Sequence, residues 1–374
     1  MKVLHVIPNL IKGGAQRLVV DICNELIKVK NINCAILVLS KSMNEFSWCT
    51  NKIKVVHCEI KFQLSLIKKN HIDISEYENF VNDFDPDIIH SHLYFSELIC
   101  HEKPRLKIKY ISHLHSNRSV FEKKNLFNFI SRKSIYEIYE KRRLHKKYLK
   151  CNKKFISISS DTTNFFNSTM QTFSNKLITL PNAISLSRFT FQNPVSLPLE
   201  SIKLVTVGSL IPKKNQIFLI KVVNYIKHRN YQVHLNIIGD GPERQRIEEE
   251  IKKFDLKTNV QMSGNKDFIE EELKKSDFYV HSATYEPFGL VILEAMASKL
   301  PVISLNGTGN LDIINDKIDG FLINEINPII FGDCIINLFN NKIKYQTISK
   351  KAFEKSLLYG MKNYANQLVK IYKN

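Results

Sequence analysis

Short apolar runs alternate with longer segments of helical periodicity along almost the whole chain. The apolar run at residues 2–8 is followed by a loop and then by residues 15–29, whose apolar positions recur every three or four residues. The same order begins again at residues 202–207. Strands that alternate with helices indicate β-α-β units and parallel sheets. The pattern therefore predicts two doubly wound, Rossmann-like α/β domains.

Other short apolar runs predict further strands, at residues 34–40, 54–58, 88–92, 111–116, 155–159, 233–238, 260–264, 278–282 and 301–305. The stretch between Pro181 and Pro198 is rich in Ser, Asn and Pro, as expected of an interdomain hinge. We place the domains at residues 1–182 and 183–374, and a C-terminal helix is expected at about 359–374.

The most informative unit is a strand, loop and helix that lead into a second strand, at residues 278–305. Gly289 ends the loop and permits a close backbone approach directly before the helix predicted at residues 290–298. The first amides of that helix, those of Leu290 and Val291, have no intrahelical acceptor and suit an anion such as a diphosphate.

Two carboxylates flank this helix start, Glu286 in the loop and Glu294 in the helix. Eight residues of helix span about 12 Å, whereas paired glycosidase carboxylates lie about 5 to 9.5 Å apart. We expect the two groups to serve separate parts of one extended ligand. The alternative is a solvated carboxylate beside a proline turn and a second one on a polar helix face.

The segment EPFGLVILEAMASKLPVIS, which begins at Glu286, closely resembles the nucleotide-diphosphosugar signature of retaining GT-B glycosyltransferases of family 4. The resemblance implies that Glu286 contacts the donor sugar and that Glu294 accepts hydrogen bonds from the nucleotide ribose. It assigns the diphosphate to the amides of Gly289, Leu290 and Val291. It also implies the GT-B fold, in which two Rossmann-like domains face each other across a cleft. In that fold the first domain is the acceptor side, the second binds the nucleotide sugar, and the last helix, at about 359–374, packs back on the first domain.

Other motifs of this family are matched in both halves of the chain. GSLIPKKNQ resembles the element that holds the diphosphate with an Arg and a Lys; Lys214 matches the lysine, whereas Ser209 replaces the arginine. The substitution puts a two-cation site in doubt. GGAQRLVVDICNEL resembles the family's GGAER element and makes Gly14 a candidate for backbone contact with the diphosphate. Arg17 is either a phosphate contact or a helix-surface charge.

Histidines stand at two predicted strand ends of the first domain. In ISHLHS, His115 matches the family's histidine near the donor sugar and phosphate, and His113 is the lesser candidate. The alternative is a surface histidine. PDIIHSH places His90 and His92 two residues apart, a spacing that suits metal ligands, but no third ligand is evident from the sequence. We interpret these two as site-lining or structural histidines and predict no metal site.

Two loops complete the predicted donor site. Asn265 and Lys266, in the segment expected to cap the next helix, are candidates for contact with the nucleotide base. Gly309 and Asn310 lie in a Gly-rich turn whose amides are expected to face the diphosphosugar.

Composition excludes several classes of protein. The 374 residues are 44% hydrophobic and 24% charged, as in a globular protein, and no apolar run reaches the 18 residues of a membrane span. The seven Cys form no Cys-x-x-Cys pair, so neither a disulfide framework nor a zinc site is indicated. We expect a cytoplasmic protein without a resident cofactor.

The formal net charge of +18 requires an explanation. Its densest source is residues 141–154, which begin with Lys141 and end with Lys154 and contain no acidic residue. We expect a helix with one basic side that binds anionic lipids at the inner face of the cytoplasmic membrane. A lysine-rich solvated helix is the alternative, and no nucleic-acid-binding motif accompanies the charge.

The resemblance thus implies a retaining transfer of a hexosyl or N-acetylhexosaminyl group from a UDP- or GDP-sugar to an acceptor hydroxyl. We expect it to be metal-independent, because the Asp-x-Asp at Asp85–Asp87 precedes a strand of the first domain and does not lie near the donor motif. A lipid-linked saccharide of bacterial envelope polysaccharide assembly is the expected acceptor. Two alternatives stay open: a nucleotide-sugar 2-epimerase with the same fold, and a non-catalytic module that binds sugar nucleotides or membranes.

Overall fold

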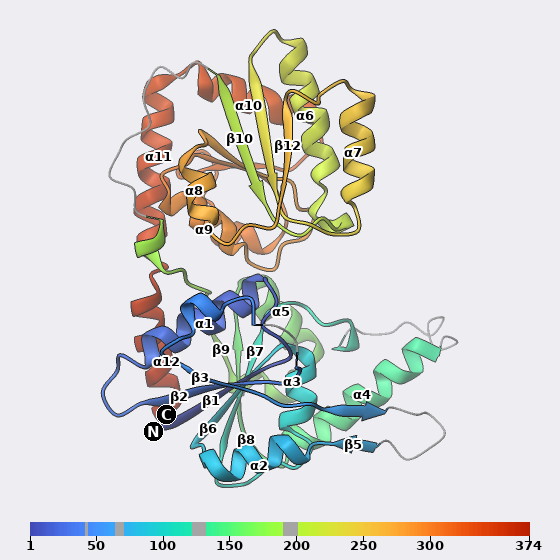
Figure 1. Ribbon diagram of the computed structural model, residues 1–374, viewed down its shortest axis with the longest axis vertical. Coiled ribbons are helices and arrows are strands. Elements are labelled where there is room, and N and C mark those ends of the chain that lie inside the picture. Colours follow the sequence, from blue (N-terminus) through green and yellow to red (C-terminus); the bar gives the residue numbers. More distant parts are fainter. Residues whose placement is uncertain (42–43, 64–70, 122–131, 190–200) are drawn as a thin grey trace. The chain divides into compact units, whose positions relative to one another are not determined.

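The computed structural model describes residues 1–41, 44–63, 71–121, 132–189 and 201–374 (Figure 1). The chain divides into two compact units. The first comprises Met1–Asn182 together with Met361–Asn374, and the second comprises Ala183–Gly360. The C-terminal helix thus groups with the first unit rather than with the residues that precede it.

The first unit is built on a parallel sheet of seven strands in the order β3-β2-β1-β6-β7-β8-β9. The strands are β1 (Lys2–Ile7), β2 (Asn33–Val38), β3 (Lys54–His57), β6 (Ile88–His92), β7 (Lys109–Leu114), β8 (Asn152–Ser157) and β9 (Leu177–Thr179). A separate antiparallel pair joins β4 (Lys61–Gln63) and β5 (His71–Asp73). The central strands are buried along nearly their whole length because helices cover both faces.

The helices of this unit are α1 (Gly14–Leu26), α2 (Ser75–Phe84), α3 (Leu93–Cys100), α4 (Arg132–Tyr148), α5 (Ser160–Thr169) and α12 (Met361–Lys373). Helix α12 packs beside α1, although more than 300 residues separate them in the sequence. Short 3-10 turns lie at η1 (Ser47–Cys49), η2 (Ser119–Phe121) and η4 (Gln171–Lys176).

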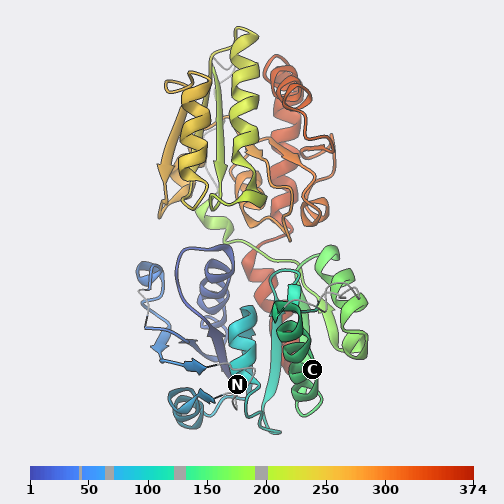
Figure 2. The ribbon, with the colours of Figure 1, turned by 90° about the vertical axis from the view of Figure 1, so that its right-hand side faces the viewer.

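The second unit repeats the plan with six parallel strands in the order β12-β11-β10-β13-β14-β15. They are β10 (Ile202–Val207), β11 (Val233–Ile238), β12 (Val260–Gly264), β13 (Phe278–His281), β14 (Val302–Leu305) and β15 (Phe321–Ile323). Figure 2, turned by 90°, shows helices on both faces of this sheet as well.

Its helices are α6 (Gln216–His228), α7 (Arg244–Lys253), α8 (Ile269–Lys274), α9 (Leu290–Ala297), α10 (Pro328–Phe339) and α11 (Lys342–Leu357). The 3-10 turns are η5 (Leu186–Arg188), η6 (Pro212–Lys214) and η7 (Gly309–Asp312). Two parallel-sheet α/β units confirm the predicted fold class.

Two local predictions are wrong. Helix α8 begins after Phe268, and no side chain caps it, so Asn265–Asp267 does not form the expected cap. The basic segment is not one helix either, because α4 ends at Tyr148 and Lys153 and Lys154 belong to strand β8. Lys153 is almost fully buried there.

Candidate functional site

The predicted donor residues gather where the strand order of the second sheet reverses. Strand β10 lies between β11, which follows it in the chain, and β13, which comes much later. The loops that leave the carboxyl ends of such strands form the usual ligand-binding edge of a doubly wound sheet. These loops are tied together, since Ser282 Oγ donates to the Lys214 carbonyl at 2.8 Å and the Thr284 amide donates to the Lys213 carbonyl at 2.9 Å.

An ion pair joins the two loops at this edge. The Lys214 ammonium donates to the carboxylate of Glu286, and His281 Nε2 lies 3.2 Å from the same carboxylate. The Lys214 and Glu286 side chains are 18% and 11% exposed. Burial alone would raise the pKa of Glu286, but the neighbouring His281 and the charge of Lys214 outweigh it and lower the pKa to about 2. Glu286 is therefore ionised at neutral pH, as a group that binds sugar hydroxyls or pairs with a cation should be.

Backbone geometry leaves space for the lysine stem. A Cβ atom at Gly208, directly after β10, would lie 3.7 Å from Cε of Lys214, so the stem passes over this glycine. Ser209 is exposed beside it, and its carbonyl accepts hydrogen bonds from Gln216 Nε2 and the Ile211 amide. The hydroxyl of Ser209 as a substitute for arginine stays a prediction.

The start of α9 has the form expected of an anion site. Gly289 precedes the helix with φ of 104°, in the left-handed region that favours glycine, and no side chain caps the helix. The amide of Ile292 donates to the Gly289 carbonyl, whereas the amides of Leu290 and Val291 stand ahead of this first bond. These are the amides that the sequence assigns to the diphosphate.

Both predicted carboxylates lie near one buried phenol. Glu294 is 7% exposed on α9, and Glu286 lies in the loop before this helix. Burial raises the pKa of Tyr279, on β13, well above its usual value, and the negative charges of Glu286 and Glu294 raise it further. The structure thus brings Glu286, Glu294, Lys214 and the α9 amides to one edge of the sheet.

The Gly-rich turn does not present its amides as expected. The Gly309 amide donates to the carbonyl of Glu286 at 2.9 Å. A Cβ at Gly309 would lie 2.1 Å from the Pro287 carbonyl oxygen, so the glycine is needed for a close backbone approach. Asn310 is fully buried. Its side-chain Nδ2 donates to Ser304 Oγ and to the Leu305 carbonyl, and its Oδ1 accepts from the Gly307 backbone amide. These residues hold the loop of Glu286 in place, and their contact with the diphosphosugar stays a prediction.

The candidates for the nucleotide base lie further along the sheet. Asn265 and Lys266 are exposed in the loop after β12, the edge strand, two positions away from β10. Their role stays a prediction.

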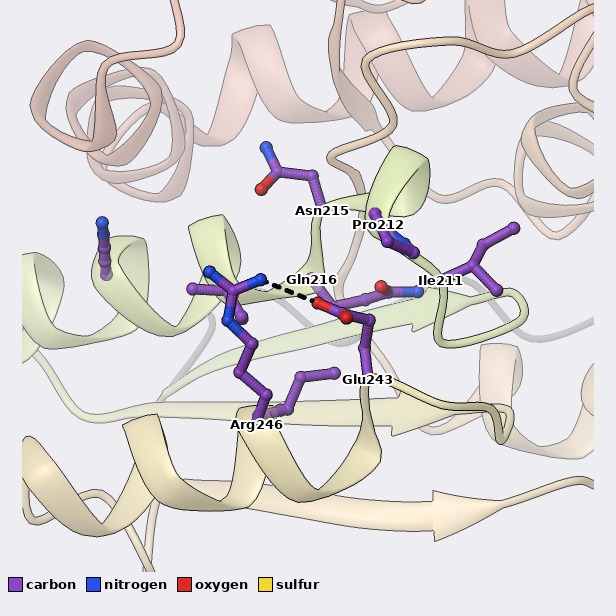
Figure 3. A pocket seen from close by; sticks show the side chains of 9 residues that line it. Ile211, Pro212, Asn215, Gln216, Glu243 and Arg246 are labelled. Carbon is purple, nitrogen blue, oxygen red and sulfur yellow. Dashed lines mark hydrogen bonds and ion pairs between the residues drawn. The ribbon is translucent and has the colours of Figure 1, made fainter. Parts of the chain in front are cut away.

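A pocket of about 210 Å³ lies beside this edge, between η6, α6 and the start of α7 (Figure 3). Glu243 and Arg246 form an ion pair of 3.1 Å at its wall. Gln216, 4% exposed, donates through Nε2 to the Ser209 carbonyl, while its Oε1 has no partner among the described residues. Neither Lys214 nor Glu286 lines the pocket, so it is distinct from the predicted donor residues.

In the first unit, the helix after the glycine pair begins where expected. Gly14 is the first residue of α1; it is exposed, and no side chain caps the helix. Gly14 as a diphosphate contact stays a prediction. Arg17 forms an ion pair of 2.7 Å with Asp21 and lies over the ring of Trp48, with its side chain 15% exposed. Its role as a phosphate contact stays a prediction.

The histidines of this unit form a larger group than the sequence indicated. His115 and His113 lie at the carboxyl end of β7, beside His90 and His92 of β6. His5 of β1 was not among the predicted site residues, yet its ring nitrogen lies within 4.8 Å of donor atoms of His90 and His92. A third histidine therefore accompanies these two, and the absence of a metal site stays a prediction. The available signal was His5 in the first strand, opposite His90 in a parallel sheet.

The basic segment keeps only part of its charge on the surface. Arg143 and Lys147 both bind the carboxylate of Glu102, and Lys141 donates to the Phe121 carbonyl. Where the side chains along α4 and just beyond it are described, at 135 and 137–150, the exposed positions are three cations and three large apolar side chains: Arg142, Lys146, Lys150, Ile135, Tyr139 and Leu149. Among the described residues, no helix is long and apolar enough to cross a membrane.

Two family models match consecutive halves of the chain. The model described as Glycosyltransferase Family 4 matches residues 12–188, and the model described as Glycosyl transferases group 1 matches residues 187–355. The chain belongs to the glycosyltransferases that these two models describe together, family 4 and group 1.

Two curated relatives of this chain differ in the acceptor that their names give. The chain is 28% identical over 171 residues to the poly(glycerol-phosphate) alpha-glucosyltransferase of Bacillus subtilis (strain 168), a match that covers 46% of this chain and 25% of that protein. It is 26% identical over 229 residues to the UDP-Gal:alpha-D-GlcNAc-diphosphoundecaprenol alpha-1,3-galactosyltransferase of Escherichia coli, with 58% of each chain covered. The chain thus spans a quarter of the first relative and just over half of the second.

Solved structures confirm the GT-B fold. Anabaena HepE in complex with UDP and glucose superposes on this glycosyltransferase with a TM-score of 0.79 over 100% of both chains, at 16% sequence identity. At this identity the likeness shows the fold alone.

Proposed function

We propose that this glycosyltransferase moves a hexosyl or N-acetylhexosaminyl group from a UDP- or GDP-sugar to an acceptor hydroxyl with retention at the anomeric carbon. The observation that carries the proposal is the arrangement of Lys214, Glu286 and the uncapped start of α9 at one edge of the second sheet. A cation, a row of free amides and an ionised carboxylate are what a diphosphate joined to a sugar requires. The Anabaena structure with UDP and glucose supports a UDP-sugar as the first donor to test.

In the proposed reaction, the bond between the anomeric carbon and the β-phosphate oxygen breaks, and its electron pair stays on that oxygen. The acceptor oxygen bonds to the anomeric carbon on the same face, and its proton passes to the β-phosphate oxygen. Negative charge therefore grows on the diphosphate, where the Lys214 ammonium and the amides of Leu290 and Val291 stabilise it. Glu286 orients the sugar, and Glu294 accepts hydrogen bonds from the ribose.

We further propose that the acceptor is a lipid-linked saccharide of bacterial envelope polysaccharide assembly, and that the protein works in the cytoplasm at the inner membrane face. The Escherichia coli relative, by its name, acts on a diphosphoundecaprenol-linked sugar, and the Bacillus subtilis relative acts on poly(glycerol-phosphate). The exposed cations and apolar side chains of α4 suit an anionic bilayer surface, because cations attract the headgroups and apolar side chains enter the interface.

The decisive experiment uses the full chain. Thermal shift against UDP-, GDP-, ADP- and dTDP-sugars identifies the donor, and transfer to undecaprenyl-diphosphate-linked saccharides follows. NMR of the product's anomeric proton then reports retention or inversion. Release of nucleotide with a retained anomer supports the proposal. Conversion of the donor into its 2-epimer without an acceptor points to the epimerase, and binding without turnover points to a non-catalytic module.

A further inference from the structure

Five histidines lie on one face of the first sheet, at the point where its strand order reverses between β1 and β6. His5 pairs in register with His90, and His92 pairs with His113 on the next strand. Side chains of register partners and of residues two apart in a strand share a face, so these four and His115 form one layer. All except His115 are buried; His115 is partly exposed.

Three of these rings are joined end to end. His5 Nδ1 lies 2.9 Å from His92 Nε2, and His92 Nδ1 lies 3.1 Å from His115 Nε2. The corresponding ring centroids are 5.1 and 5.3 Å apart, whereas the stacked rings of His113 and His115 are separated by 4.3 Å. Short nitrogen distances with distant centroids mean that the rings meet edge to edge, as in N–H···N hydrogen bonds.

The chain of bonds continues into the C-terminal helix. The Tyr372 hydroxyl lies 3.4 Å from His5 Nε2 and 2.8 Å from His90 Nδ1. We call His90, Tyr372, His5, His92 and His115 the histidine chain. Each bond needs one proton, so the direction of any one bond fixes the direction of all of them.

The far end of the histidine chain decides that direction. His90 Nε2 is buried without a hydrogen-bond partner among the described residues. If the protons ran toward His90, this atom would be an orphaned buried N–H, which is rarer than an unsatisfied acceptor. The favoured order is therefore His90 Nδ1–H to Tyr372, Tyr372 O–H to His5, His5 Nδ1–H to His92 and His92 Nδ1–H to His115. Nε2 of His115 then accepts, and its proton must sit on Nδ1.

Burial keeps the rings of His90, His92 and His115 neutral, as such a chain requires. It lowers the pKa of His90 and His92 well below the usual range and that of His115 to about 3. A neutral imidazole carries one donor and one acceptor, so the chain can be completed without an unpaired charge.

A metal ion fits this geometry less well. His5, His90 and His92 offer nitrogens within 4.8 Å of one another, as do His92, His113 and His115. Metal ligands must direct their lone pairs at one common point. The facing nitrogens of His5 and His92 instead point at each other.

We propose that the histidine chain fixes the tautomer of His115, so that this residue carries its proton on Nδ1 and offers an Nδ1–H donor at the carboxyl end of β7. The histidines and Tyr372 behind it are positioning residues, since they act through His115. The inference rests on the proposed function only in the effect that it predicts on kcat. Neutral histidine in water prefers its proton on Nε2, so the chain imposes the less common form. Its hydrogen bonds polarise one another in the same direction, which strengthens that Nδ1–H as a donor.

Long-range ¹H–¹⁵N NMR of the full chain, labelled with ring-¹⁵N histidine, tests the proposal without any substrate. His115 is assigned by the signal lost in His115→Gln. We expect the proton of His115 on Nδ1 in the parent. In Tyr372→Phe, which removes the hydroxyl between His90 and His5, both tautomers should appear. The kcat should fall about two- to tenfold, the effect of one neutral hydrogen bond, with little change in KM for the donor.

Tyr364→Phe is the matched control. Tyr364 lies on the same helix, is also buried, and its hydroxyl has no partner among the described residues. It should leave the His115 signals and kcat unchanged. A parent with the proton of His115 on Nε2, or identical His115 signals in both Phe variants, would overturn the tautomer proposal whatever the activity. The expected NMR result in a protein without transferase activity would instead count against the proposed function alone.

Discussion

The Lys214 ammonium is bound to the Glu286 carboxylate, although 72 residues separate them in the sequence. Lys214 follows β10, Glu286 follows β13, and these strands are neighbours in the sheet. In the proposed reaction a diphosphate competes with Glu286 for the same ammonium. The ion pair thus holds the lysine in place and keeps the carboxylate ionised before the donor arrives.

Replacing Lys214 by Met should weaken binding of UDP or GDP about 10- to 150-fold, because a charge-assisted hydrogen bond contributes roughly 1.5–3 kcal/mol. Isothermal titration calorimetry measures the change. Lys213→Met is the matched control, since this neighbouring ammonium is exposed and lies over the ring of Tyr285. Equal affinities for the two variants would contradict the role of Lys214.

The stability of the protein should depend on pH through Glu286. The pKa of this group is about 2 in the folded protein, against an ordinary value of 4.5. A lowered carboxyl pKa stabilises the fold above the ordinary value, and this contribution, on the order of 3 kcal/mol, is lost as pH falls from about 4.5 to 2. Urea unfolding should show Glu286→Gln less stable than the parent at pH 7, with a gap that narrows below pH 4.5. A gap of constant size would show that the pKa of Glu286 is not lowered.

The two carboxylates should have separable effects. Glu294→Ala should weaken nucleotide binding by roughly 1.5–3 kcal/mol, because the ribose loses a charged acceptor. Glu286→Ala should lower kcat more than nucleotide affinity, because Glu286 is expected to touch the sugar. Steady-state kinetics with calorimetry of the free nucleotide separates the two, with exposed Glu325→Ala as the control. If both variants bind and turn over like the parent, the assignment of the carboxylates is wrong.

Transfer should persist after chelation. The Lys214 ammonium and the amides of α9 neutralise the diphosphate without Mg²⁺. Activity in EDTA, compared with activity after addition of Mg²⁺ or Mn²⁺, measures this directly. Complete loss in EDTA that Mg²⁺ or Mn²⁺ restores would refute metal independence.

Binding to anionic vesicles should depend on the exposed cations of α4. Each Lys or Arg near the surface contributes about 1 kcal/mol, so Arg142→Gln with Lys146→Gln should lower the partition coefficient about 30-fold. Arg143→Gln with Lys147→Gln removes the same charge from residues that already bind Glu102, and it should affect vesicle binding much less. Sedimentation with vesicles at low and high salt measures both pairs, because salt screens exposed charges. Equal losses for the two pairs, or binding that ignores salt, would favour a merely solvated helix.

Local signals in the sequence were sufficient for the fold and for the main residues that gather at one edge of the second sheet. The alternation of short apolar runs with helical periodicity predicted both parallel sheets. Gly289 and the two carboxylates at positions 286 and 294 belong to one continuous segment, so their relation to the start of α9 could be read from spacing alone. Sequence motifs also located Lys214, but they did not indicate that it pairs with Glu286.

Only the tertiary structure decided which polar groups face each other. The sequence of the turn at Gly309 predicts a ligand-binding loop. In the structure the Gly309 amide donates to the Glu286 carbonyl, and the Asn310 side chain donates to Ser304. The sequence predicts that Lys153 is part of a basic surface. The register of β8 instead directs its side chain into the interior. His5 joins His92 and Tyr372 because strand pairing and helix packing bring together segments from opposite ends of the chain. Periodicity and motifs record neighbours within one element, whereas ion pairs and hydrogen-bond chains depend on register between elements, which no single stretch of sequence contains.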